Sequence, residues 1–205
     1  NSVVNVQLWT VGQKKVLHGS MRTNLKNVTE TPYVDIEDIR RRCNISVLGK
    51  SDIYNKLSSA GIQLGPQFRL MNQMSLGDNE AFCEVASALN DKTHQVYCID
   101  IQFLDTCLQS LIGATDYENT NWIPFSIEQL QFFDTVEATE IFTAYVHSQL
   151  EKSSNRLLRG TVTLFREDGS VIFRLKGFEV KGFQSQQGTT STKYAIEWSS
   201  VDTEK

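Results

Sequence analysis

The chain has 205 residues, of which 40% are hydrophobic and 21% are charged, and its formal net charge is -4. This length and apolar content suffice for one or two domains with a buried core. The negative charge and the absence of a basic run argue against a nucleic-acid-binding surface. No apolar run reaches the ~18–20 residues of a membrane span, and the N-terminus has no signal-peptide pattern. We therefore expect a cytoplasmic protein that binds neither nucleic acid nor membrane.

Residues 3–10 and 14–22 are predicted to form a β-hairpin around Gly12-Gln13. A chain that begins inside a strand suggests that a segment preceding it has been removed. Residues 35–42 have the pattern of a short helix, with acidic residues first and three arginines last, which suits the helix dipole. We expect the arginines to form a solvated helix end, with a phosphate contact as the alternative.

Residues 51–60 are predicted to form a second helix, capped by Ser51 and closed by Gly61. A turn with two glycines and a proline follows. Further strands are predicted from alternating apolar residues and turn signals. They span residues 68–76, 80–88, 127–133, 140–150, 157–166 and 171–183, with a polar loop at 114–121 and a tight turn at Asp168-Gly169. A polar linker at 184–192 and a short strand at 194–198 end the chain.

One longer helix is predicted among these strands, at residues 99–111. Its apolar residues recur three and four apart, as in a single buried stripe: Ile101, Leu104, Leu108 and Leu111. Asp105 and Gln109 lie one turn apart on a neighbouring face. A carboxyl beside such a stripe is expected to have a raised pKa unless it is paired, and the alternative is that both side chains face solvent. These elements predict an α+β fold in which the sheet curls around the helix.

The cysteines and histidines offer no recognisable metal or nucleophile motif. The four cysteines show neither CxxC pairing nor zinc-ligand spacing with histidine, which predicts reduced thiols: Cys43, Cys83, Cys98 and Cys107. The three histidines are scattered: His18, His94 and His147. His147 is expected to be an ordinary surface or edge histidine, and the spacing does not support a Cys107–His94 nucleophile pair. A glycine-rich phosphate loop, GxSxG and HExxH are all absent from the sequence.

Three segments resemble, in chain order, motifs of the dehydratase domains of modular type I polyketide synthases. Residues 61–68, GIQLGPQF, resemble the GYxYGPxF motif, and residues 104–109, LDTCLQ, resemble the LDxxLQ motif. Residues 123–126, IPFS, are similar to the LPFS element. Residues 194–198 resemble the YxxxW strand that leads from such a domain towards a ketoreductase. The resemblance covers nearly the whole chain.

The fold that this resemblance implies is the second half of a double hotdog, a curved antiparallel sheet wrapped around a central helix. It implies the closing strands of a first hotdog at residues 1–22 and an inter-hotdog linker at 23–50. The C-terminal hotdog then spans 51–184, and 185–205 form a linker toward the next synthase domain. The expected partners are an acyl carrier protein and adjacent polyketide synthase domains, and a homodimer stays open.

The activity that the resemblance implies is removal of water from a β-hydroxyacyl chain on acyl carrier protein, giving an α,β-enoyl thioester. A histidine of the first hotdog removes the α-proton, Asp105 protonates the leaving hydroxyl, and Gln109 holds Asp105 by a hydrogen bond. The flanking motifs supply the expected substrate-tunnel residues: Leu64, Gly65, Pro66, Phe68, Pro124 and Phe125. Because the carrier's phosphopantetheine delivers the substrate, no metal or nucleotide cofactor is expected.

The chain also departs from the family pattern. It lacks the base motif HxxxGxxxxP, since His18 is followed by Arg22 where glycine is needed. Leu64 replaces the second tyrosine of GYxYGPxF, and Asp100-Ile101 replaces a His-Pro pair. Three functions therefore stay open. They are the C-terminal part of a working dehydratase, a catalytically inactive dehydratase-like scaffold or docking domain, and a dehydratase-derived isomerase or cyclase.

Overall fold

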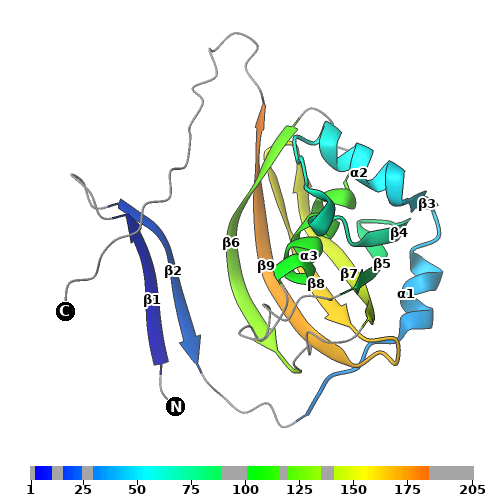
Figure 1. Cartoon of the computed structure of the whole chain (residues 1–205), viewed down its shortest axis with the longest axis horizontal. Helices are drawn as coiled ribbons and strands as arrows, with labels where there is room; N and C mark the ends of the chain where they lie inside the picture. Colours follow the sequence, from blue (N-terminus) through cyan, green and yellow to red (C-terminus); the bar gives the residue numbers. More distant parts are fainter. Residues whose placement is uncertain are drawn as a thin grey trace.

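The structure is a computed structural model that describes residues 3–10, 16–24, 30–88, 101–115, 120–134 and 141–184. Its first two strands, β1 (Val3–Thr10) and β2 (Val16–Asn24), pair antiparallel as a two-stranded sheet (Figure 1). The predicted hairpin is thus confirmed, although its turn lies outside the described residues. The predicted linker from residue 185 onward and the strand at 194–198 also lie outside them.

A seven-stranded antiparallel sheet forms the main body, in the order β3-β4-β5-β7-β8-β9-β6. The strands are β3 (Ser46–Gly49), β4 (Met71–Gly77), β5 (Glu80–Ala88), β6 (Thr120–Phe132), β7 (Ile141–Ser154), β8 (Leu157–Phe165) and β9 (Val171–Gln184). The six strands predicted between residues 60 and 184 are all present, β5 with the predicted ends and the others with shifted ends. The span expected to be a linker, 23–50, contains helix α1 and strand β3, and β3 is an edge of this sheet.

Strand β6 begins earlier than predicted. The polar loop was expected to reach residue 121 and the strand to start at 127, but β6 starts at Thr120 and includes the IPFS segment. Pro124 is tolerated there because β6 is an edge strand, where one backbone face needs no ladder hydrogen bond. The register with β9 shifts between Pro124 and Ser126, so the strand is irregular at the proline.

Helix α1 (Ile36–Arg42) forms where it was predicted. The Asp35 side chain caps it by accepting a hydrogen bond from the Asp38 backbone N–H at 3.0 Å. The arginines at its end pair with carboxylates: Arg40 with Glu37, Arg41 with Asp38, and Arg42 with both Asp38 and Glu80. These ion pairs agree with a helix end whose charges are matched within the protein.

Helix α2 (Lys50–Ser59) differs from prediction at its start. Gly49 occupies the N-cap position and no side chain caps the helix, because strand β3 runs directly into it; the predicted Ser51 cap is wrong. Its end is as predicted. Gly61 has φ +80°, its N–H bonds to the Ser58 carbonyl, and the Ile62 N–H bonds to the Leu57 carbonyl. This is the Schellman arrangement, which glycine permits.

Helix α3 (Ile101–Gly113) lies inside the curve of the sheet, as Figure 1 shows. The main hydrophobic core joins α2 and α3 to one sheet face through residues such as Met74, Val146 and Leu164. A second cluster on the other face packs against α1: Ile39, Cys43, Phe82, Tyr145, Phe165 and Val171. The expected α+β hotdog arrangement, a curved antiparallel sheet around a central helix, is confirmed.

The predicted buried stripe of α3 is wrong for Ile101, while Leu104 and Leu108 pack against the main core without being fully buried. Ile101 is 51% exposed, and Leu104 and Leu108 are only partly buried, whereas Leu111 is fully buried. The face turned to the sheet carries Phe103 and the small side chains of Thr106, Cys107 and Ser110 instead. Small residues let the helix approach the strands closely. Because they are only weakly hydrophobic, they do not stand out in the spacing of apolar residues along the sequence.

Gly160 on β8 shows how close this approach is. A methyl group at Gly160 would lie 2.7 Å from Leu111 Cδ1 and would also overlap the Gln149 carbonyl oxygen. The Ser110 hydroxyl hydrogen-bonds the Ser148 hydroxyl of β7 from the same helix face. Helix α3 is therefore held against the sheet by both packing and a buried polar contact.

No helix in the described part of the chain has the length and apolar character needed to cross a membrane.

Candidate functional site

Gln109 connects two of the predicted motif segments, 61–68 and 104–109. Its side chain is 3% exposed, and its Nε2 donates to Asp105 Oδ2 at 2.6 Å and to the Phe68 carbonyl at 3.1 Å. Helix α3 provides Asp105 and Gln109, while Phe68 ends the short 3-10 turn η1 (Pro66–Phe68). The hydrogen bond expected between Asp105 and Gln109 is present. The alternative in which both face solvent is wrong for Gln109, and Asp105 is half-buried.

The Phe68 carbonyl determines which way the Gln109 amide faces. A backbone carbonyl can only accept a hydrogen bond, so the amide must turn its NH2 group toward Phe68. One N–H of this NH2 group donates to the Phe68 carbonyl, and the other donates to Asp105 Oδ2. Oδ2 therefore acts as a hydrogen-bond acceptor. A proton on this carboxyl therefore belongs on Oδ1. The Gln109 Oε1 is buried and has no hydrogen-bond partner among the residues that the structure describes.

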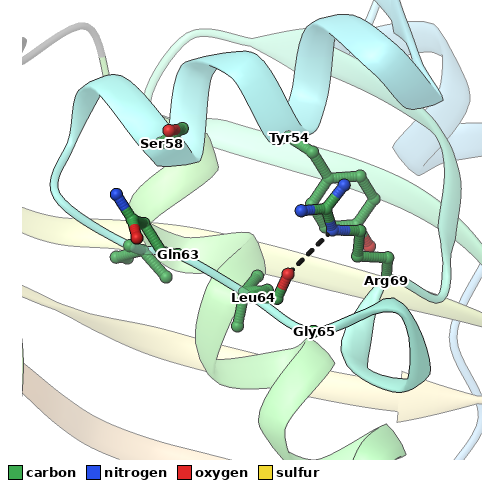
Figure 2. A pocket seen from close by; sticks show the side chains of 7 residues that line it. Tyr54, Ser58, Gln63, Leu64, Gly65 and Arg69 are labelled. Atoms are coloured by element: carbon green, nitrogen blue, oxygen red, sulfur yellow. Dashed lines mark hydrogen bonds between the residues drawn. The ribbon is translucent and has the colours of Figure 1, made fainter.

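A pocket of about 430 Å³ lies between α2 and the turn that precedes η1 (Figure 2). Its lining is Tyr54, Ser58, Ile62, Gln63, Leu64, Gly65 and Arg69. Figure 2 shows Arg69 lying across Tyr54, with its Nε donating to the Leu64 carbonyl at 3.0 Å. Two of the predicted tunnel residues, Leu64 and Gly65, thus line a real pocket. Pro66 and Phe68 lie in η1, next in the chain.

Tyr54 is a pocket-lining residue that the sequence did not reveal. Its hydroxyl accepts a hydrogen bond from the Met71 N–H at 2.9 Å, and burial raises the pKa of Tyr54 to about 12. The phenol is therefore protonated at neutral pH and serves as a fixed wall of the pocket. In the sequence, Tyr54 stands beside Ile53 among the apolar residues of α2, and this pattern indicates only that both are buried. Burial alone does not mark a residue as part of a pocket.

Pro124 and Phe125 lie away from this pocket's lining, on edge strand β6. The Phe125 side chain is 60% exposed, and the Lys181 ammonium lies 3.2 Å from its ring centroid. The structure therefore joins the 61–68 and 104–109 segments through the Gln109–Phe68 hydrogen bond, while the pocket lining includes neither Asp105 and Gln109 nor the 123–126 segment.

His147 is not the surface histidine that was expected. It is buried in β7, and its Nε2 lies 2.7 Å from Glu80 Oε2. Tyr145 and His147 alternate with residues that face α3, so His147 lies on the sheet face under α1 and cannot reach Asp105. His94 and the side chain of His18 lie outside the described residues.

Cys107 is unsuited to act as a nucleophile. It is fully buried against the sheet, and burial raises its pKa well above the usual value. The thiolate is the reactive form of cysteine, so a buried protonated thiol is inert. Among the described residues of the motif segments, Asp105 is the ionisable side chain that the Gln109 amide holds by a hydrogen bond.

Comparison with known proteins identifies relatives of this chain. A family model described as "Polyketide synthase dehydratase N-terminal domain" matches residues 32–190. "Probable polyketide synthase 1" of Dictyostelium discoideum is 24% identical over 183 residues, which cover 82% of this chain and 6% of that protein. Polyketide synthase PksN of Bacillus subtilis is 21% identical over 191 residues, covering 90% of this chain and 3% of that protein.

Solved dehydratase structures share the fold. The CurJ dehydratase, solved as an inactive mutant with Compound 21, aligns with a TM-score of 0.76 and 21% identity over 89% of this chain and 65% of that one. A trans-AT polyketide synthase dehydratase domain from Brevibacillus brevis aligns with a TM-score of 0.78 and 16% identity, over 89% of this chain and 66% of that one. The chain thus spans about two thirds of a solved dehydratase domain and a small part of the synthases.

Proposed function

The chain belongs to the polyketide synthase dehydratase family, and on this premise we propose that it is the C-terminal hotdog of a dehydratase domain. Its substrate is a β-hydroxyacyl chain carried on acyl carrier protein, and its product is the α,β-enoyl thioester. The observation that carries this proposal is the buried Gln109 amide, which joins Asp105 to the turn of the GPQF segment.

In the proposed reaction Asp105 is the general acid. The Asp105 Oδ1–H gives its proton to the β-hydroxyl oxygen, the C–O bond breaks, and water leaves. A base removes the α-proton, and the electron pair of that C–H bond becomes the new double bond. Gln109 is a positioning residue, because its N–H to Oδ2 keeps the proton-bearing oxygen of Asp105 free for the substrate.

The base in this proposal is a histidine on a segment outside this chain. His147 is the one histidine whose side chain is described, and it lies on the other face of the sheet from Asp105. Among the related structures are two different inactive mutants of CurK dehydratase. One has a histidine changed to phenylalanine and the other has an aspartate changed to asparagine. These mutants support an acid–base pair of one histidine and one aspartate.

The proposed substrate tunnel runs past the turn formed by Leu64, Gly65, Pro66 and Phe68. Pro124 and Phe125 are exposed on β6, and we assign them to the side of the tunnel that the first hotdog completes. The acyl chain arrives on the phosphopantetheine of the carrier, so the reaction uses no metal or nucleotide. Adjacent synthase domains are the other proposed partners. A homodimer would form if two copies of this domain pair within the synthase.

A catalytically inactive scaffold is the second candidate, favoured by Leu64, which lacks the hydroxyl of the family's tyrosine. The deciding experiment uses the complete domain, with the segment upstream of Asn1, and a β-hydroxyacyl carrier substrate followed by mass spectrometry. Loss of one water supports the dehydratase. Ring closure or a shifted double bond indicates a cyclase or isomerase, and an unchanged substrate indicates a scaffold.

A further inference from the structure

Three side chains of the kinds that bind metals converge on the sheet face under α1. Cys43 follows the last residue of α1, Glu80 begins β5, and His147 lies in the middle of β7. One potential ligand atom from each, the thiol sulfur, a carboxylate oxygen and a ring nitrogen, lies within 4.8 Å of the other two. All three residues are buried. Thiolate, imidazole and carboxylate are the ligand types of protein zinc sites.

The framework holds these ligands in place. Phe82 is paired with His147 across β5 and β7, and Glu80 lies two residues before Phe82, so Glu80 and His147 share one face of the sheet. Cys43 is fixed over this face because α1 packs against Phe82 and Tyr145. The Cys43 N–H also bonds to the Ile39 carbonyl at 2.9 Å. The three ligands thus come from three distant chain segments that the fold makes rigid.

We propose that Cys43, Glu80 and His147 bind one zinc ion, which fastens α1 to the sheet, with water as the fourth ligand. On binding, the Cys43 S–H proton passes to solvent and the thiolate sulfur coordinates the ion, while His147 coordinates through a neutral ring nitrogen. A second pocket, of about 260 Å³, is lined by Cys43 together with Arg40, Phe82 and Glu84, and it provides a path for the ion and the water. This site lies on the opposite sheet face from Asp105 and is independent of the proposed reaction.

Arg42 is the internal competitor for this ion. Its Nε donates to Glu80 Oε1 at 2.9 Å and its Nη2 to Oε2 at 3.2 Å, and His147 shares Oε2. In the loaded site Oε1 keeps its hydrogen bond from Arg42 Nε, while Oε2 binds the ion and gives up its hydrogen bonds to Arg42 Nη2 and His147.

The buried charges that face the proposed ion are two negative ligands and one guanidinium. Glu80 and the Cys43 thiolate offset the zinc charge, and Arg42 also pairs with Asp38. Asp38 is shared with Arg41 at the exposed end of α1, and Arg40 has its own partner in Glu37.

The test is metal binding by the 205-residue chain after treatment with a chelator. We expect one zinc per chain by calorimetry. Cobalt, used as a spectroscopic substitute, is expected to give a thiolate-to-metal charge-transfer band together with tetrahedral ligand-field bands. Cys43→Ser and His147→Gln are expected to weaken zinc binding at least tenfold and to lose the charge-transfer band or alter the ligand-field bands. Cys83→Ala removes another buried cysteine from the same strand as Glu80 and is the matched control, expected to leave binding unchanged.

Arg42→Gln adds a test that does not depend on removing a ligand. Because it frees Glu80 from the guanidinium, it is expected to tighten zinc binding several-fold. The proposal is overturned if wild-type protein gives no cobalt–thiolate band, or if Cys83→Ala and Cys43→Ser affect zinc binding equally. A dehydration assay bears on neither result, so failure of this site and failure of the proposed function are distinguishable.

Discussion

The Nε2 of Gln109 lies 2.6 Å from Oδ2 of Asp105. This contact spans one helical turn, and the second N–H of the same amide is held by the Phe68 carbonyl. The carboxyl thus has Oδ2 committed to accepting a hydrogen bond, and in the proposed reaction Oδ1 carries the proton.

Asp105→Asn in the complete domain is expected to lower the rate of water loss by about 10²- to 10⁴-fold, because the amide cannot donate an acidic proton. The variant keeps the size and the acceptor oxygen that Gln109 needs, so folding is expected to be unaffected. The measurement is the rate of water loss from a carrier-bound substrate by mass spectrometry. Asp78→Asn, in the turn between β4 and β5, is the matched control; an unchanged rate in Asp105→Asn would rule out Asp105 as the acid.

Gln109→Leu is expected to reduce kcat in the complete domain while KM changes little, because Leu fills the space but cannot orient Asp105. In the 205-residue chain it also leaves the Phe68 carbonyl without its donor. We therefore expect a loss of about 1–3 kcal/mol in the free energy of unfolding, measured with urea. A kcat equal to that of the wild type would show that Gln109 has no positioning role.

The isolated 205-residue chain is expected to show no turnover of a β-hydroxyacyl carrier substrate. The described residues place no histidine beside Asp105, and His147 is held by Glu80 on the other sheet face. Adding the upstream segment as part of one polypeptide is expected to supply the base and restore water loss. Detection of water loss from the isolated chain alone would contradict this division of the acid and the base.

Gly160→Ala is expected to destabilise the fold by about 1–3 kcal/mol, because the added methyl group overlaps the Gln149 carbonyl and crowds Leu111. Gly19→Ala is the matched control, since a methyl group there meets nothing within 4 Å. The control is expected to change stability by less than about 0.5 kcal/mol. Urea unfolding followed by circular dichroism measures both; equal effects would mean that α3 does not rest closely on β8.

Tyr54→Phe tests the pH dependence of stability. Burial raises the Tyr54 pKa from 10.0 to about 12, so between these values the unfolded chain loses a proton that the native chain keeps. The stabilisation from this residue is complete below pH 10.0 and falls as the pH rises to about 12. We expect the variant to be less stable by about 1–3 kcal/mol at neutral pH, because the Met71 N–H loses its acceptor.

The alkaline range then separates the two proteins further. The wild type is expected to lose more stability than Tyr54→Phe between pH 10.0 and about pH 12, so that the difference between them narrows. Urea unfolding at a series of alkaline pH values gives this comparison. Parallel losses in the two proteins would mean that the Tyr54 phenol ionises as it does in the unfolded chain.

Local patterns predicted most of the fold. Alternating side chains and turn residues such as Asp168-Gly169 place β8 and β9 within a few residues of their observed ends, since these signals act over short distances. Helical spacing placed Asp105 and Gln109 on one face, and the hydrogen bond between them was expected from the family resemblance. Strand β3 was missed because four residues carry too little alternation to be recognised.

The remaining features depend on contacts between distant parts of the chain. The buried face of α3 was misjudged because Cys107 and Ser110 face the sheet through their small size, and the spacing of apolar residues does not report size. His147 is buried because α1 folds over the strand, which the sequence near residue 147 does not show. Its grouping with Cys43 and Glu80 likewise has no regular spacing, so a motif search overlooks it.

The hydrogen bond from Gln109 to the Phe68 carbonyl also has a consequence for protein engineering. In the proposed function the 61–68 segment selects the acyl chain, while the same segment, through one backbone oxygen, orients the acid. Exchanging this segment between dehydratases to change the accepted substrate would then also re-aim Asp105. Grafts that include the matching turn of α3 are expected to retain more activity than grafts of the segment alone, so selectivity and rate must be redesigned together.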